Sequence, residues 1–307
     1  MKRMLIRIPL FILAALFCYT FLLFLSKKYI EPKSRPNLYV YSSHSNVRFQ
    51  EIKTVSDLDI LFIGSSHSFR GFDTRRYFDK GYNVFNLGTR SQAPLQTEFL
   101  LKRYLKTTNP KLVVIEVFPY LLTIDGIEAS LDVINNDYVS NDSYGLLLKE
   151  KNIKLLNSLL YNTANNFLFG EKFLKKVPLG KVYHYHKGGF ISRDMSYYKY
   201  EKDLDKTMLE FKDIQLQSLN EIVNLLNRKN IDYIFVQAPI ASARYGSIEN
   251  NNEFDSIMTS KGKYINFNEL VKLDDSLHFY DSHHLNQDGV DIFNDKFIEL
   301  VLDEKGK

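Results

Sequence analysis

A serine in the first quarter of the chain and an Asp–His pair near its C-terminus are the residues best able to do covalent chemistry. Ser66 lies in Gly-Ser-Ser-His-Ser, directly after a short apolar run that ends at Gly64. Asp281 and His284 lie three positions apart in a polar loop before the last helical pattern. A serine hydroxyl needs a nearby base to attack an acyl carbon, and that base needs a group that fixes its tautomer. We therefore predict Ser66 as the nucleophile, His284 as the general base and Asp281 as the residue that orients it.

Two backbone N–H groups are candidates for the oxyanion hole of such a site. Gly88 follows a second apolar run, and without a side chain it lets a substrate approach its N–H closely. The N–H of Ser66 is the other candidate. Donors of this kind stabilise the negative charge that develops on an attacked carbonyl oxygen. The sequence thus predicts Ser66 and Gly88 as the oxyanion hole.

The pattern of apolar residues predicts how these segments meet. Strands are predicted over 58–63, 82–87, 112–118, 233–236 and 264–267, and helices over 95–105, 204–227 and 290–302. Strands that alternate with helices form a mainly parallel sheet covered on both faces, here an α/β three-layer sandwich of about five strands. Ligands of such sheets bind beyond the carboxyl ends of the strands. Residues 64–68, 88–92 and 281–286 are therefore expected to gather at that edge.

Further polar residues in these loops are expected to contact the substrate. They are His67, Arg90, Gln92, Gln237 and His283. His283 is also a rival base, but the spacing from Asp281 favours His284. The alternative without catalysis is that Ser66 only caps the following helix and that Asp281 is only a turn residue.

A zinc site is the main chemical alternative to a serine nucleophile. His67, Asp281, His283 and His284 offer enough ligands, because a catalytic zinc needs only three from the protein. Side chains of adjacent histidines usually point apart, however, and no His-Glu-x-x-His spacing occurs in the sequence. The sequence therefore favours a site without a metal, and serine chemistry requires no cofactor.

Three short motifs carry a resemblance to a known family. The segments FIGSSHS, NLG and DSHHLNQDG resemble three sequence blocks of the SGNH (GDSL-like) hydrolases, with Ser65 in place of the usual Asp. The resemblance covers about 57–119 and 205–303. It implies a flavodoxin-like fold in which Ser66, Asp281 and His284 form the triad and Gly88 lies in the oxyanion hole.

The third block of that family, Gly-x-Asn-Asp, is absent here. The strand that should precede it ends Glu116-Val117-Phe118-Pro119. Loss of one oxyanion donor costs roughly 10²- to 10³-fold in rate. Either Arg90, Gln92 or Gln237 substitutes for the missing asparagine, or the enzyme is slow, or it handles a different acyl group.

The N-terminus reads as a membrane anchor. Residues 8–26 contain no charge, and about 18 such residues are enough to span a bilayer as a helix. We therefore predict an anchor over 1–28, a juxtamembrane linker over 29–56 and a catalytic domain over 57–303. Basic residues flank the apolar run on both sides, so the positive-inside rule does not orient it. The formal net charge of +4 gives no reason to expect nucleic acid, and the only cysteine, Cys18, lies in the apolar run.

The alternation of strands and helices fails over 121–203, which is predicted as an insertion. Its second half is basic and aromatic. This composition is compatible with a solvated lid or cap, and also with a platform that binds an anionic glycan or a membrane surface. With an anchor and a Gly-Ser-Ser motif, the chain is similar to the D-alanine-transfer and alginate O-acetylation proteins. That resemblance implies a single-pass membrane protein with an extracytoplasmic domain.

The same resemblance implies an O-acyltransferase or esterase that modifies a cell-envelope polysaccharide, working beside a membrane-bound O-acyltransferase. The residues named for catalysis are the same for hydrolysis and for transfer. A different class is also compatible with the missing third block, namely an anchored scaffold or glycan-binding protein without catalysis.

Overall fold

The computed structural model describes residues 2–29, 43–169, 182–199 and 204–303 of the 307 residues. The chain divides into two compact units. We call Met1–Asn46 with Ser130–Val177 the helical unit, and Val47–Ala129 with Pro178–Lys307 the sheet unit. Residues 30–42 of the predicted linker, and 170–181 and 200–203 of the predicted insertion, lie outside the described residues.

The sheet unit is built on five parallel strands in the order β2-β1-β3-β6-β7. They are β1 (Ile60–Ile63), β2 (Val84–Asn86), β3 (Leu112–Glu116), β6 (Asp232–Gln237) and β7 (Tyr264–Asn266). Each begins and ends within three residues of a strand predicted from the sequence. The predicted α/β fold with a parallel sheet of five strands is confirmed.

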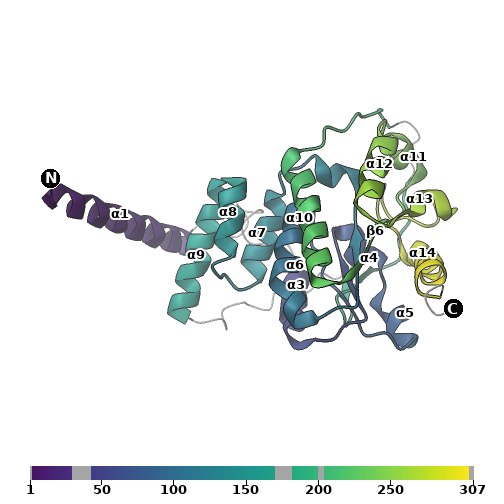
Figure 1. Cartoon of the computed structure of the whole chain (residues 1–307), viewed down its shortest axis with the longest axis horizontal. Helices are drawn as coiled ribbons and strands as arrows, with labels where there is room; N and C mark the ends of the chain where they lie inside the picture. Colours follow the sequence, from purple (N-terminus) through teal and green to yellow (C-terminus); the bar gives the residue numbers. More distant parts are fainter. Residues whose placement is uncertain (1, 30–42, 170–181, 200–203, 304–307) are drawn as a thin grey trace. The chain divides into compact units, whose positions relative to one another are not determined.

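Helices cover both faces of this sheet because alternate strand side chains point to opposite faces. On one face, α6 (Pro94–Thr108) packs against α10 (Asp213–Lys229) (Figure 1). On the other face, α4 (Ser66–Gly71), α5 (Thr74–Asp79) and α14 (Gln287–Phe297) cover a continuous apolar cluster. The largest side chains of that cluster are aromatic: Phe62, Phe72, Tyr77, Phe190, Phe267, Phe279, Phe293 and Phe297. Packed apolar side chains on both faces explain why these strands are almost continuously apolar.

The helix predicted over 204–227 begins later than expected. Residues 204–212 are not helical, and α10 starts at Asp213. The Thr207 N–H donates to Ser247 O at 2.8 Å, and the Glu249 N–H donates to Thr207 O at 3.0 Å. The backbone of this segment is therefore used in a bridge to another loop instead of in a helix.

Shorter elements complete the sheet unit. They are η2 (Ile52–Thr54), η3 (Pro119–Leu122), α11 (Ser242–Gly246), α12 (Asn251–Lys261), α13 (Phe267–Leu270), the π-helix η5 (Ile298–Asp303), and an antiparallel pair of β4 (Tyr183–Tyr185) and β5 (Ile191–Arg193). The β4–β5 pair comes from the predicted insertion, yet it belongs to this unit.

The helical unit contains α1 (Lys2–Tyr29), α8 (Ser143–Glu150), α9 (Ile153–Phe169) and most of α7 (Ile127–Asn136). Tyr19 of α1 donates a hydrogen bond of 2.8 Å to Asn157 Oδ1 of α9. Leu155 and Leu159 of α9 are fully buried. The first half of the predicted insertion is therefore helical. Residues 43–51 of the predicted linker form a helix, α3, that runs from the helical unit into the sheet unit.

The predicted membrane anchor corresponds to α1, one helix with Pro9 inside it (Figure 1). Several of its apolar side chains are exposed, such as Phe11 at 74% and Phe17 at 72%. In the part of the chain that the structure describes, no helix is long and apolar enough to cross a membrane. The predicted span is therefore not found there.

Candidate active site

The structure brings together Ser66, His284 and Asp281. Ser66 is the first residue of α4, after β1, and the other two lie in the loop before α14. Ser66 Oγ is 2.8 Å from His284 Nε2. His284 Nδ1 is 2.9 Å from Asp281 Oδ2 and 3.0 Å from Asp281 Oδ1. A hydroxyl, an imidazole and a carboxylate are thus joined in the order that proton transfer requires.

The turn that presents Ser66 is held by a residue that the sequence did not single out, Glu116 at the end of β3. Its Oε2 accepts hydrogen bonds of 2.7 Å from both the N–H and the hydroxyl of Ser65. Gly64 has a φ of +149°, and a Cβ there would lie 2.7 Å from Glu116 atoms. The only hint in the sequence was a charged residue ending an apolar run.

Ser65, and not Ser66, is the N-cap of α4. Its hydroxyl accepts a hydrogen bond of 3.1 Å from the His67 N–H. Capping is a favoured role of serine, and here it leaves the Ser66 hydroxyl for His284. Asn286 caps α14 in the same way, because its side chain accepts from the Gly289 N–H at 3.1 Å.

The loop that carries His284 is closed by local contacts. Asp281 Oδ1 also accepts from the N–H groups of His283 and His284, at 3.0 and 2.8 Å. The Tyr280 N–H donates to His284 O at 3.1 Å, and the Tyr280 ring stacks on the His284 ring at 5.4 Å with an angle of 3°. These contacts fix the direction of the imidazole.

Burial and hydrogen bonding set the charges of these groups. Burial lowers the pKa of His284 well below its ordinary value, although the hydrogen bond to Asp281 opposes this shift. Burial by itself would raise the pKa of Asp281, but hydrogen bonds from His284 and the His283 backbone outweigh it and lower that pKa. At neutral pH the imidazole is therefore neutral, with Nδ1 protonated towards the carboxylate and a lone pair on Nε2.

The two predicted oxyanion donors differ in what they contact. The Ser66 N–H opens α4, and the first N–H groups of a helix have no acceptor within the helix. The Gly88 N–H donates to Asn86 Oδ1 at 3.1 Å. A Cβ on Gly88 would lie 2.9 Å from Ser65 O and 3.1 Å from the Phe69 nitrogen. Because it has no side chain, Gly88 lets its own loop pack closely against the turn at Ser65. Its N–H, however, already donates to Asn86 in this structure.

Asn86 is a second residue that sequence reasoning missed. It is fully buried at the end of β2. Its Oδ1 accepts from Ser68 Oγ at 3.0 Å, and its Nδ2 donates to Ser68 O at 2.8 Å. Asn86 thus ties the Gly88 loop to α4, which positions both candidate donors.

Three residues proposed to replace the missing asparagine have other partners. Gln92 Oε1 accepts from the N–H and hydroxyl of Thr89, both at 2.9 Å. Gln237 Oε1 accepts from the Tyr264 hydroxyl at 2.7 Å, on the β7 side of the sheet, while its Nε2 is buried and makes no hydrogen bond in the described residues. Arg90 lies 3.6 Å from Glu128. The contacts of Gln92 stabilise the loop after β2, and the contact of Gln237 connects β6 to β7.

His67 and His283 lie directly beside the triad. His67 Nε2 is 3.3 Å from His283 Nδ1, and His67 Nδ1 is 3.5 Å from Glu116 Oε1. Phe118, in the position of the missing block, packs edge-on against the His67 ring at 4.6 Å. Burial, and next the charge of His67, lower the pKa of His283 to about 4.

The expectation that adjacent histidines point apart is wrong here. The ring centroids of His283 and His284 are only 4.2 Å apart. One ring nitrogen from each of His67, His283 and His284 lies within 4.8 Å of the other two, so these residues could hold a metal ion. Asp281, the fourth ligand considered from the sequence, contacts the Nδ1 side of His284 instead.

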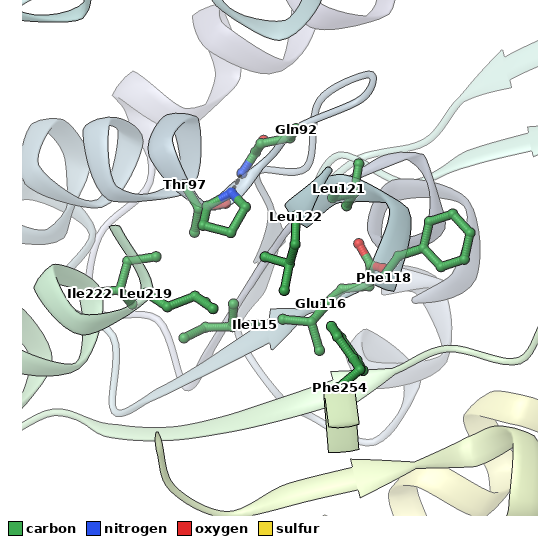
Figure 2. A pocket seen from close by; sticks show the side chains of 12 residues that line it. Gln92, Thr97, Ile115, Glu116, Phe118, Leu121, Leu122, Leu219, Ile222 and Phe254 are labelled. Atoms are coloured by element: carbon green, nitrogen blue, oxygen red, sulfur yellow. Dashed lines mark hydrogen bonds between the residues drawn. The ribbon is translucent and has the colours of Figure 1, made fainter. Parts of the chain in front are cut away.

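Two pockets adjoin these residues. Figure 2 shows the first, where the Glu116 side chain and mainly apolar side chains from β3, η3, α6, α10 and α12 meet. Its lining residues are Gln92, Pro94, Thr97, Ile115, Glu116, Val117, Phe118, Leu121, Leu122, Leu219, Ile222 and Phe254. The second is lined by apolar and polar side chains, among them Arg70, Arg193 and Tyr280.

Comparison with known proteins finds structural similarity only. No family model matches the sequence, and no curated protein is significantly similar to it. A Bacteroides fragilis protein assigned as an acylhydrolase is 13% identical, with a TM-score of 0.39 over 82% of this chain and 93% of that chain. A GDSL-like lipase of Bacteroides thetaiotaomicron is 13% identical, with a TM-score of 0.40 over 85% of this chain and 100% of that chain. Similarity at this level does not determine the chemistry of this chain.

Proposed function

We propose that the protein is a serine esterase or O-acyltransferase of the SGNH type that works through an acyl-Ser66 intermediate. One observation carries the proposal: the 2.8 Å contact between Ser66 Oγ and His284 Nε2, with Asp281 at 2.9 Å behind the imidazole. This is the arrangement that activates a serine hydroxyl near neutral pH.

In the proposed reaction, His284 Nε2 takes the Ser66 hydroxyl proton as Oγ attacks an ester carbonyl. The tetrahedral intermediate expels the alcohol, which receives that proton from the imidazolium. Water or a sugar hydroxyl then gives its proton to Nε2 and attacks the acyl-serine. The second tetrahedral intermediate breaks the bond between Oγ and the acyl carbon, the acid or the new ester leaves, and the imidazolium returns the proton to Ser66 Oγ. Asp281 stabilises the imidazolium, and the Ser66 N–H donates to the oxyanion.

An anionic cell-envelope polysaccharide is the proposed substrate class. The Arg193 guanidinium lies 4.4 Å from the centroid of the Tyr280 ring, and the same ring stacks on the imidazole of His284. Arg70 donates a short hydrogen bond to the Tyr280 hydroxyl. Two cations and an aromatic ring beside a nucleophile suit an acidic sugar, because charge attracts it and the ring offers a stacking face.

Attachment to the outside of a membrane, beside a membrane-bound O-acyltransferase, is a further part of the proposal. It is supported by the uncharged run over 8–26 and by exposed apolar side chains on α1. Recovery of the full-length chain in the membrane fraction, and its release when α1 is removed, would test attachment.

Reaction with a fluorophosphonate probe tests the nucleophile. Labelling should be lost in Ser66→Ala and His284→Ala, and retained in the control Ser260→Ala, an exposed serine near the end of α12. Undiminished labelling of Ser66→Ala would overturn the proposed function.

A second candidate is an anchored glycan-binding or scaffold protein without catalysis. The engaged Gly88 N–H and Phe118 in place of the third block favour it, because both reduce the number of oxyanion donors. It predicts that Ser66→Ala leaves the cellular role intact, whereas loss of Arg193 abolishes it.

A further inference from the structure

We propose that His67, His283 and His284 form a binding site for a divalent transition-metal ion of the zinc class, and that occupancy of this site blocks the serine chemistry. The blocking step rests on the proposed function, whereas metal binding itself does not. The site uses the neighbours of the catalytic base, and His67 and His283 have no part in the acyl-transfer steps above.

The spacing of two ring nitrogens matches that of zinc ligands as well as that of an imidazole–imidazole hydrogen bond. A tetrahedral zinc with Zn–N bonds of about 2.0–2.1 Å places its ligand nitrogens about 3.3 Å apart. His67 Nε2 and His283 Nδ1 are 3.3 Å apart. One ring nitrogen of each of the three histidines lies within 4.8 Å of the other two, and rotation of the His67 and His283 rings about their broad terminal torsions can bring the three closer.

Two of the three imidazoles already have a carboxylate behind them. His284 Nδ1 faces Asp281 at 2.9 Å, and His67 Nδ1 faces Glu116 Oε1 at 3.5 Å. Metal-binding histidines almost always donate their other ring N–H to such a group, which fixes the tautomer and strengthens the ligand. The two carboxylates also offset the charge of a divalent cation.

Glu116 supplies an independent observation. This side chain is 3% exposed, and its Oε1 is buried without a hydrogen-bond partner in the described residues. A buried carboxylate oxygen that makes no hydrogen bond is costly, and His67 Nδ1 contacts this one only at 3.5 Å. A metal on His67 Nε2 would keep the proton on Nδ1, and a small shift of the ring would turn the 3.5 Å contact with Glu116 Oε1 into a hydrogen bond.

The metal and the serine compete for one lone pair. Because His284 Nδ1 contacts Asp281, Nε2 is its only nitrogen left for a metal, and Nε2 also accepts the Ser66 proton. A coordinated imidazole cannot act as a base. Zinc, copper or nickel suit imidazole ligands, whereas magnesium and calcium prefer oxygen.

Binding is tested first on the purified full-length protein after treatment with EDTA and its removal. Competition with a chromophoric chelator should show one equivalent of Zn²⁺ bound. His67→Ala and His283→Ala should each weaken binding by at least ~10-fold, and Glu116→Gln by about 10- to 100-fold. The control His184→Ala, an exposed histidine that pairs with Asp194, should bind as the wild type does. Binding that survives His67→Ala and His283→Ala unchanged would overturn the proposed site.

Fluorophosphonate labelling of the metal-free wild type then tests competition. Free Zn²⁺ at ten times its Kd should lower the rate of labelling about tenfold, EDTA should restore that rate, and equal Mg²⁺ should have no effect. Labelling that Zn²⁺ leaves unchanged, although it binds at the three histidines, would overturn the blocking role. Absence of labelling without metal would instead contradict the proposed function, while the chelator experiment would still decide whether the metal site exists.

Discussion

Glu116 shows how one buried side chain connects two parts of the site. Its Oε2 holds the Ser65 turn through two hydrogen bonds of 2.7 Å, and its Oε1 faces His67. Hydrogen bonds to a charged acceptor contribute about 1.5–3 kcal/mol, more than those between neutral groups. The position of Ser66 therefore depends on a residue in a neighbouring strand.

Glu116→Gln should lower both stability and reactivity. The amide has one acceptor oxygen and no charge, so we expect a loss of about 1–3 kcal/mol in the free energy of unfolding. Displacement of the serine turn should slow fluorophosphonate labelling by up to about 100-fold. Denaturant unfolding and labelling rates measure the two effects. The exposed Glu128, changed to Gln, serves as the control, and equal effects of both substitutions would contradict this role of Glu116.

The pKa of His284 predicts how kcat/KM falls at acid pH. Burial lowers it below 6.5, and His67, Arg70 and His283 lower it further, while Asp281 raises it. The Tyr280 ring also stacks on the His284 imidazole. Only the neutral imidazole accepts a proton, so a lowered pKa keeps the base active at lower pH. With EDTA present, kcat/KM should fall only well below pH 6.5. A fall centred at or above pH 6.5 would show that another group controls the reaction.

At the scale of elements, the site depends on close packing between the loop after β2 and the start of α4. Asn86 bonds to Ser68 and Gly88, and Gly88 leaves no room for a side chain next to Ser65 O. Because the buried Asn86 amide uses both its oxygen and its nitrogen in hydrogen bonds, it holds the loop after β2 and the start of α4 in a fixed arrangement.

Gly88→Ala should disturb this support. The added Cβ would lie 2.9 Å from Ser65 O, a backbone atom that cannot move away independently. We expect a loss of about 1–3 kcal/mol in the free energy of unfolding and slower labelling of Ser66. Gly246→Ala is the matched control, because no atom lies within 4 Å of its added Cβ, and its stability should change by less than about 1 kcal/mol. Wild-type stability and labelling in Gly88→Ala would contradict the packing argument.

At the scale of the whole molecule, segments far apart in sequence build the surface around the site. The β4–β5 pair, predicted only as part of an insertion, brings Arg193 over the rings of Tyr183 and Tyr280. The Tyr198 N–H donates to Phe279 O at 2.9 Å, which ties the same segment to the loop that carries His284. Part of the insertion thus belongs to the candidate binding surface.

Arg193→Ala should therefore discriminate between substrates by charge. For an acetyl ester of an acidic sugar, kcat/KM should fall about two- to fivefold, because a partly exposed cation contributes at most about 1 kcal/mol. A neutral ester should be affected less. Arg228→Ala, at the exposed end of α10, is the control. Equal losses for charged and neutral esters would exclude a charge-recognition role for Arg193.

The sequence by itself determined the order and type of the main strands, and it predicted the three residues that the fold brings together as a candidate triad. Apolar runs closed by glycine or proline predict buried parallel strands, and Asp281 and His284 lie close enough in sequence for one loop to join them. These signals are local, because strand periodicity and short spacings depend only on neighbouring residues. For the same reason the helix boundary near Asp213 was missed, since a bridge between Thr207 and Ile248 decides it.

Only the tertiary structure decided which groups near the serine are engaged and which are not. It placed Glu116 under Ser65, turned the Gly88 N–H towards Asn86, and brought His67 to within 3.3 Å of a histidine 216 residues away. The direction of a side chain is set by packing between strands and helices that are distant in sequence. No local pattern encodes those directions, so a cluster of three histidines beside the predicted base became visible only in the folded chain.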